Sequence, residues 1–135
     1  MYAGWKSVVG KYTRPSVSKS VWQIVNSFGG LFILWIAMYL SLQVGYWLTL
    51  LLSIPAAGFA VRIFIIQHDC GHGSFFASRK ADHMVGAALG VVTLFPYGYW
   101  KKTHAIHHAT AGDLDRRETG DIWTMTVAEY QAASK

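Results

Sequence analysis

The most prominent feature of the sequence is one long apolar stretch. Residues 21–66 contain a single charged side chain, Arg62, whereas residues 1–20 are polar and basic. A helix crosses the hydrocarbon core of a bilayer in about 20 residues. The stretch is therefore long enough for two spans, and we predict membrane helices over residues 24–42 and 47–66.

A tight turn at residues 43–46 separates the two predicted helices. Gly45 gives this turn a permissive backbone position, and Tyr46 and Trp47 are typical of the membrane–water boundary. Pro55 lies inside the second helix, where a membrane helix tolerates proline. The apolar stretch is therefore predicted to form a transmembrane hairpin.

A shorter apolar run follows at residues 84–96. At 1.5 Å per residue it would be about 20 Å long as a helix, which is less than the hydrocarbon core of about 30 Å. We predict a re-entrant or interfacial segment here, followed by an aromatic boundary group at residues 97–100. Because this segment does not cross, the polar regions before and after it are expected on the same side of the membrane.

The composition agrees with a membrane protein. Only 14% of the residues are charged and 53% are hydrophobic, whereas soluble domains carry about 25% charged residues. The net charge is +5, but the basic residues flank apolar segments and form no stripe of their own. This favours anionic lipid headgroups over nucleic acid as the partner. Residues 1–20 lack the apolar core of a signal peptide.

Basic residues also predict the orientation. They occur before and after the hairpin, and the turn between its helices has none. By the positive-inside rule, the N-terminus and the region after the hairpin are cytoplasmic. The predicted fold is an all-α integral membrane helical bundle. It has a cytoplasmic lead-in (1–20), a transmembrane hairpin (24–66), and then a re-entrant or interfacial segment with cytoplasmic histidine-bearing helices (67–135).

Five of the six histidines fall into two short clusters. His68 and His72 lie in the segment HDCGH, and His104, His107 and His108 lie in HAIHH. Residues three and four apart share one face of a helix, so each cluster is expected to aim its imidazoles at one point. Imidazole suits iron, zinc, copper and nickel. Because both clusters are predicted on the cytoplasmic side, we expect them to converge on one metal centre. Five nitrogen ligands exceed the need of one zinc ion and indicate an octahedral metal or a two-metal site.

The neighbours of the two clusters have simpler interpretations. Asp69 and Cys70 lie between ligands and point off the ligand face of a helix, and we interpret Cys70 as a packing residue. His83 belongs to neither cluster, and its neighbour Asp82 suggests a solvated turn. We therefore expect no metal role for His83.

Several acidic residues follow the second cluster, namely Asp113, Asp115, Glu118 and Asp121. A ligating histidine usually donates its other N–H to a carboxylate, so one of these acids is a candidate for that role. A solvated acidic face that balances Arg116 and Arg117 is an equally good interpretation. Further along, Thr126 and Glu129 have the spacing of a capping box, which predicts that a helix starts near Thr126.

The two histidine clusters resemble the first two histidine boxes of the membrane fatty-acid desaturases. The resemblance is closest to the bacterial and plastid branch, whose members often act at the delta-12 position. It extends to several flanking segments: RPS at 14–16 with WQ at 22–23, FIIQ at 64–67, GSFF at 73–76 and GDIWT at 120–124.

The resemblance implies a non-haem centre of two iron ions held by His68, His72, His104, His107 and His108. It also implies O₂ as co-substrate and electrons from ferredoxin or cytochrome b5. The reaction would remove two hydrogens from adjacent methylenes of an acyl chain, leaving a cis double bond and water. The substrate would be an acyl lipid or acyl thioester, and the setting a multi-pass protein of the bacterial inner membrane.

Members of this family also carry a third box, (H/Q)xxHH, and a second pair of membrane helices. Apart from HAIHH itself, no segment of this form occurs in these 135 residues, and neither does a second pair of membrane helices. We therefore expect the chain to be the N-terminal part of a desaturase, a fragment that is inactive alone.

Other functional classes fit less well. Related histidine-box hydroxylases and ketolases are the nearest alternative, but the GDIWT and RPS segments favour a desaturase. A membrane zinc protease would need HExxH with glutamate as general base, whereas Asp69 follows His68 here. A bis-histidine haem protein would place its histidines inside the spans. A non-catalytic truncated membrane protein that binds metal or lipid is the remaining alternative.

Overall fold

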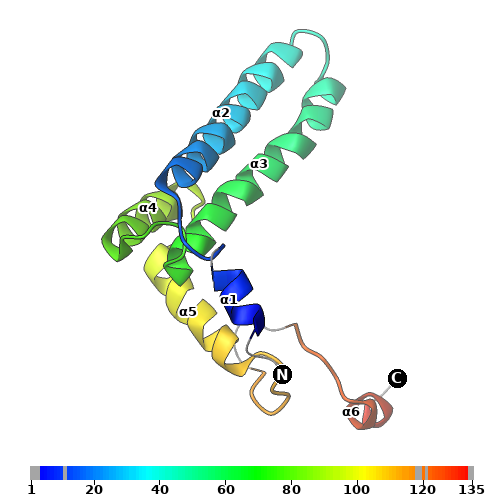
Figure 1. Ribbon diagram of the computed structural model, residues 1–135. Coiled ribbons are helices and arrows are strands. Elements are labelled where there is room, and N and C mark those ends of the chain that lie inside the picture. Colours follow the sequence, from blue (N-terminus) through cyan, green and yellow to red (C-terminus); the bar gives the residue numbers. More distant parts are fainter. Residues whose placement is uncertain (1–3, 11, 118–119, 121, 134–135) are drawn as a thin grey trace. The chain divides into compact units, whose positions relative to one another are not determined.

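The computed structural model describes residues 4–10, 12–117, 120 and 122–133. Within these residues the chain is helical and has no β-strand, so the predicted all-α class is confirmed there. The chain divides into two compact units, which meet in sequence between Tyr97 and Gly98. The helices, shown in Figure 1, are α1 Gly4–Gly10, α2 Val17–Ser41, α3 Tyr46–His72, α4 Arg79–Val92, α5 Tyr97–Thr110 and α6 Val127–Ala132.

Helices α2 and α3 form the predicted hairpin and lie side by side (Figure 1). Gly30 leaves room for the ring of Phe59, because a Cβ at that position would overlap the ring. Near the turn, the hydroxyls of Ser41 and Thr49 are 2.7 Å apart and join the two helices. The two helices extend beyond the predicted spans, and α3 continues until His72.

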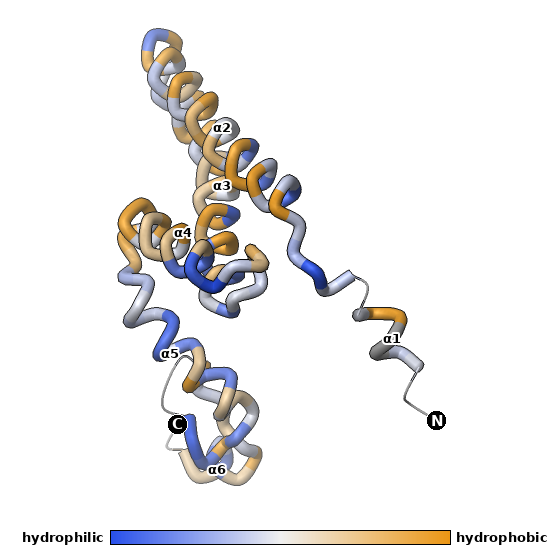
Figure 2. Tube along the Cα trace, turned by 60° about the vertical axis from the view of Figure 1, so that its left-hand side comes forward, coloured by the Kyte–Doolittle hydropathy of each residue, from blue (hydrophilic) through white to orange (hydrophobic). Residues whose placement is uncertain are grey.

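Both hairpin helices are long and apolar enough to cross a membrane, with 25 and 27 residues. Figure 2 shows apolar residues along both of them and more hydrophilic residues along α5. In the most apolar window of each hairpin helix only 17% is buried, whereas the core helix of a soluble protein buries most of its apolar side chains. Large side chains such as Phe32, Ile33 and Ile54 are exposed. This exposure fits a lipid environment.

The core of the first unit surrounds the last turns of α3. Ile66 and Cys70 are fully buried there, and Ile63 is 1% exposed. Leu31 of α2 and Leu89 of α4 belong to the same apolar cluster. The interpretation of Cys70 as a packing residue is therefore confirmed. This core holds the part of α3 that carries the first histidine cluster.

Helix α4 takes the place of the predicted solvated turn around His83. The Ser78 side chain caps its N-terminus by accepting a hydrogen bond of 3.3 Å from the backbone N–H of Ala81, a preferred arrangement at a helix start. The solvated-turn prediction was therefore wrong: His83 is exposed but lies within this helix, and Asp82 is only 1% exposed. Asp82 Oδ1 accepts a hydrogen bond of 2.8 Å from the N–H of Phe76 and so closes the α3–α4 loop.

In the second unit, α6 begins as the capping-box pattern predicts. Thr126 Oγ1 accepts a hydrogen bond from the Glu129 backbone at 3.2 Å, and Glu129 Oε2 accepts one from the Thr126 backbone at 2.6 Å. The short-range sequence signal was sufficient here because both partners lie within one helical turn.

Candidate metal site

The first histidine pair lies on the last turn of α3. The Nε2 atoms of His68 and His72 are 3.3 Å apart, and their ring centroids are 4.5 Å apart. This closeness follows from the helix itself, because residues four apart stand above one another on one face. The prediction that the HDCGH segment is helical and pairs these two rings is confirmed.

Helix α3 ends directly after His72, and its end is held by several contacts. Gly73 adopts the left-handed conformation with φ 66°, which glycine accepts without strain. The N–H of Ser74 donates to the carbonyl of Asp69 at 3.1 Å, and Arg79 Nη1 donates to the carbonyl of His72 at 3.1 Å. A basic side chain at a helix C-terminus satisfies the last carbonyls and the helix dipole. The chain direction after His72 is thereby fixed.

Asp69 has a role that the sequence analysis missed. Its Oδ1 lies 3.2 Å from Nδ1 of His68. A carboxylate only accepts hydrogen bonds, so in this contact Nδ1 of His68 is the donor, and Nε2 of His68 faces Nε2 of His72 with its lone pair. Asp69 does point off the ligand face, but from there its carboxylate reaches the far edge of the neighbouring ring. Such a carboxylate partner orients a metal-binding histidine and raises its basicity.

The second histidine cluster lies on α5. The Nε2 atoms of His104 and His108 are 3.0 Å apart. The ring of Trp100 stacks on His104, with centroids 4.6 Å apart and planes at 18°. The His107 ring lies to one side, 5.8 Å from His104 and 5.7 Å from His108 between centroids. The structure therefore brings His104 and His108 together most closely, with His107 beside them.

Both pairs fit the donor geometry of a metal site. A metal–imidazole bond is about 2.0–2.1 Å long, so two nitrogens on one ion at octahedral or tetrahedral angles lie about 2.8–3.4 Å apart. The observed separations of 3.3 and 3.0 Å match this range. A hydrogen bond between two neutral imidazoles has a similar length, so the distances fit a metal and a shared proton equally. Imidazole is a good ligand for iron and zinc, so these residues suit either metal.

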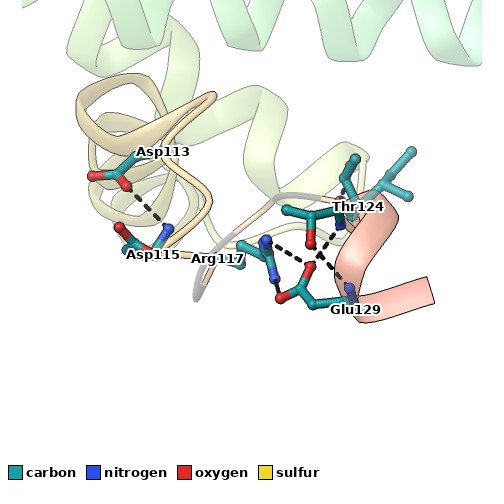
Figure 3. Close-up of polar contacts among 7 residues, drawn as sticks. Asp113, Asp115, Arg117, Thr124 and Glu129 are labelled. Carbon is teal, nitrogen blue, oxygen red and sulfur yellow. Dashed lines mark hydrogen bonds and ion pairs between the residues drawn. The ribbon is translucent and has the colours of Figure 1, made fainter. Parts of the chain in front are cut away.

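Two of the acidic residues after the second cluster, Asp113 and Asp115, lie in an exposed turn. Asp113 Oδ1 accepts a hydrogen bond of 3.1 Å from the backbone N–H of Asp115. Figure 3 shows this contact together with the pairing of Arg117 and Glu129. The two Arg117–Glu129 contacts are 2.7 and 3.2 Å long, so the partner of this arginine lies twelve residues further along. Glu118 and Asp121 lie outside the described residues.

Glu129 has a strongly lowered pKa. The hydrogen bond from Arg117 and those from Thr126 lower the pKa of Glu129 from 4.5 to about 2. Its carboxylate is therefore charged throughout the physiological range. This pairing ties the segment before α6 to the helix itself.

An apolar pocket of about 520 Å³ lies in the first unit. Its walls come from α2, α3 and the turn after α4, and its lining is almost entirely apolar or aromatic. Small residues on α3, Ala56, Ala57 and Ala60, leave the space open between larger side chains. A volume of this size is in the range of small-molecule and lipid sites, about 300–1,000 Å³.

Comparison with known proteins supplies the family. A fatty acid desaturase from Bacillus subtilis (strain 168) is 52% identical over 127 residues, which is 94% of this chain and 36% of that protein. An omega-3 fatty acid desaturase of Caenorhabditis elegans is 30% identical over 78% of the chain and 26% of its own length. An sn-1 acyl-lipid omega-3 desaturase (ferredoxin) of Synechocystis is 39% identical over 42% of the chain and 16% of its own length.

The chain thus spans about a third, or less, of the length of these relatives. No solved structure matches it significantly. The family model for fatty acid desaturase matches residues 44–132, a range that includes both histidine clusters. The chain belongs to the fatty acid desaturase family.

Proposed function

We propose that this chain forms part of a membrane desaturase that introduces a cis double bond into an acyl chain with O₂. The observation that carries the proposal is the presence of two histidine pairs on helices in a chain of this family. The Nε2 atoms are 3.3 Å apart in the first pair and 3.0 Å apart in the second. Bound iron would supply the O₂-dependent removal of hydrogen from an unactivated C–H bond, which side chains alone cannot perform.

The proposed ligands are those of the two clusters: His68, His72, His104, His107 and His108. The backbone of the first cluster is held by Tyr97, whose hydroxyl donates to the carbonyl of Cys70 at 3.0 Å. Cys70 lies between the two histidines of this cluster.

The chain's own residues have defined tasks in this proposal. Asp69 keeps the proton of His68 on Nδ1, so that Nε2 is available to a metal. The pocket beside α3 offers an acyl chain an apolar lining. The name of the Caenorhabditis elegans relative gives a fatty acid as substrate, and the name of the Synechocystis relative gives an acyl lipid and also ferredoxin. We propose an acyl lipid or acyl thioester as substrate, and ferredoxin or cytochrome b5 as electron donor.

The proposed setting is a multi-pass protein of a bacterial inner membrane, with the N-terminus and both histidine clusters cytoplasmic. Helix α4 supports this arrangement because its 14 residues give a length of about 21 Å, too short to cross the hydrocarbon core of about 30 Å. The region after α4 would then return to the side where α3 ends. A reporter fused after Thr110 should therefore show a cytoplasmic location.

The test is product analysis with the full-length product of the gene, expressed in a bacterium that lacks acyl desaturases. We expect new cis-monoenoic or dienoic acyl chains by gas chromatography with mass spectrometry, and iron in the purified protein. A hydroxylated product would assign the chain to the related hydroxylases. A protein that binds iron but yields neither product, with donor and O₂ supplied, would contradict the proposed reaction.

A further inference from the structure

Gln67, directly before His68, is a fully buried polar residue at 0% exposure. A buried amide is unfavourable unless both of its ends are hydrogen-bonded. Here Oε1 accepts a hydrogen bond of 2.6 Å from the hydroxyl of Thr93, and Nε2 donates one of 3.2 Å to the carbonyl of Phe95. One side chain of α3 thereby binds the turn between α4 and α5 at two points.

The turn that Gln67 holds has an unusual backbone. Leu94 lies between Thr93 and Phe95, the two residues that Gln67 contacts, and has φ 56°. This is a left-handed backbone conformation that residues other than glycine rarely adopt. The N–H of Phe95 donates to the carbonyl of Gly90 at 3.0 Å, the bond that closes a helix C-terminus of this type. The turn is therefore tight, and the Gln67 amide fixes it on both sides of its least favourable residue.

Tyr97, the first residue of α5, makes a second connection to the same turn of α3. Its hydroxyl donates to the carbonyl of Cys70 at 3.0 Å, and burial raises the pKa of this hydroxyl, so it remains protonated. The Tyr97 ring lies over Gly86 of α4, where a Cβ would overlap it, and a Cβ at Gly90 would crowd the carbonyl oxygen of Phe95 and the backbone of Tyr97. The start of α5 is therefore held by α3 on one side and by α4 on the other.

We propose that Gln67 and Tyr97 are positioning residues, which fasten the turn after α4 to the last turns of α3 and thereby hold the turn of α3 that carries His68 and His72. Gln67 precedes His68, and Tyr97 contacts the residue midway between His68 and His72. A small displacement at either contact would shift the backbone that aims both rings. This inference rests on the proposed function, because it concerns the metal that this histidine pair would help to bind.

A merely structural role makes a different prediction. In that case, loss of one hydrogen bond lowers the stability of the fold by a similar amount wherever in the bundle it occurs. The affinity of the variant for the metal then equals that of the wild type. The chain offers a matched control in Thr49, whose hydroxyl lies 2.7 Å from that of Ser41 at the other end of the hairpin. Thr49→Val and Thr93→Val delete the same hydroxyl from the same side chain in two different places.

The experiment uses the full-length product of the gene, purified in detergent or nanodiscs. Four forms are compared: wild type, Thr93→Val, Tyr97→Phe and Thr49→Val. The metal is removed, cobalt(II) is added, and the dissociation constant is measured from the ligand-field absorption. Iron per chain is measured in parallel on protein isolated without metal removal. Both substitutions near α5 are nearly isosteric, so they avoid the folding risk of Gln67→Leu.

We expect Thr93→Val and Tyr97→Phe to bind cobalt(II) about 10-fold or more weakly, because positional errors near 1 Å and lost support of ligands have effects of that size. The dissociation constant of Thr49→Val for cobalt(II) should stay within about twofold of the wild-type value, since a substitution remote from the site rarely has a larger effect. Equal affinities in all four forms, with equal losses of thermal stability, would overturn the positioning role. Wild type that binds neither iron nor cobalt(II) would instead overturn the proposed function itself.

Discussion

The two histidine pairs have the same spacing and nearly the same local geometry, with Nε2 separations of 3.3 and 3.0 Å, yet their surroundings differ. The first pair stands on a turn of α3 whose other face, Ile66, Gln67 and Cys70, is fully buried. The second pair stands on α5, where Trp100 and Thr110 are buried and most other residues are exposed or half-buried.

This difference separates two contributions to the site, namely the spacing of the histidines within a helix and the packing that holds that helix in place. The spacing of four residues alone brings two imidazoles together on any helix, and both clusters show it. The position of the helix depends on what packs against it. For the first pair, the core and the capped end of α3 supply that position. The second pair has the stacked ring of Trp100 from its own helix as its neighbour. The substitutions described below test each of these two contributions separately.

The largest effect is expected from removal of a proposed ligand. In the full-length protein, alanine at His68, His72, His104, His107 or His108 should abolish product, because each substitution removes one of the nitrogens proposed to bind the metal. Gas chromatography of acyl chains is the measurement. His83→Ala is the control and should retain activity, since His83 lies on α4 outside both clusters. Retained product in the His107 variant would remove that residue from the ligand set.

A smaller effect is expected from Asp69→Asn, which keeps the shape of the side chain but removes its charge. His68 then loses the charged partner that orients its ring, and metal affinity should fall about 10- to 100-fold, as for other carboxylates behind a ligand. Cobalt(II) titration measures the change. Asp113→Asn, in the exposed turn, is the matched control. An equal loss in both variants would show that the effect is one of net charge.

Gly73→Ala tests the capped end of α3. Alanine at φ 66° costs about 1–2 kcal/mol, and its Cβ would collide with the Arg79 guanidinium, which would then lose the carbonyl of His72. We expect lower thermal stability by that amount or more. Gly29→Ala is the control, because nothing lies near its Cβ and helical glycine to alanine is favourable by about 0.5–1 kcal/mol. Equal stability of the two variants would contradict the capping role of Gly73.

The smallest effect is expected from the ion pair of the second unit. Because the pKa of Glu129 is lowered to about 2, its pairing with Arg117 is fully present above the ordinary carboxyl pKa and is lost as the pH falls through about 2. Nuclear magnetic resonance titration of the Glu129 carboxyl would show this midpoint. Arg117→Gln should move it upward toward 4.5. A midpoint near 4.5 in the unsubstituted protein would mean that the pair does not form.

Features that depend on neighbours in sequence could be predicted well. The hairpin, the start of α6 at Thr126 and the pairing of histidines four apart all follow from hydrophobic period, capping chemistry and helix geometry. Burial of Cys70 was predicted for the same reason, because it lies opposite the ligand face. These signals are contained within one helix or one turn.

Features that depend on distant partners could not be predicted. Asp82 was assigned to a solvated turn, but the α3–α4 loop folds over it and Phe76 donates to its carboxylate. Gln67 finds its partners 26 and 28 residues away, and Arg117 pairs with Glu129 instead of a nearby acid. The contact of Asp69 with His68 was within reach of sequence reasoning, since a carboxylate beside a ligating histidine is a known supporting arrangement.

The most direct test of the account is the amount of iron bound per chain in the purified full-length protein, measured by mass spectrometry of the metal. The account predicts two iron ions per chain, and a clear loss when one histidine of either pair, His72 or His108, is changed to alanine. Iron that is absent from the wild type, or unchanged in both variants, would contradict the assignment of the two histidine pairs as one metal centre.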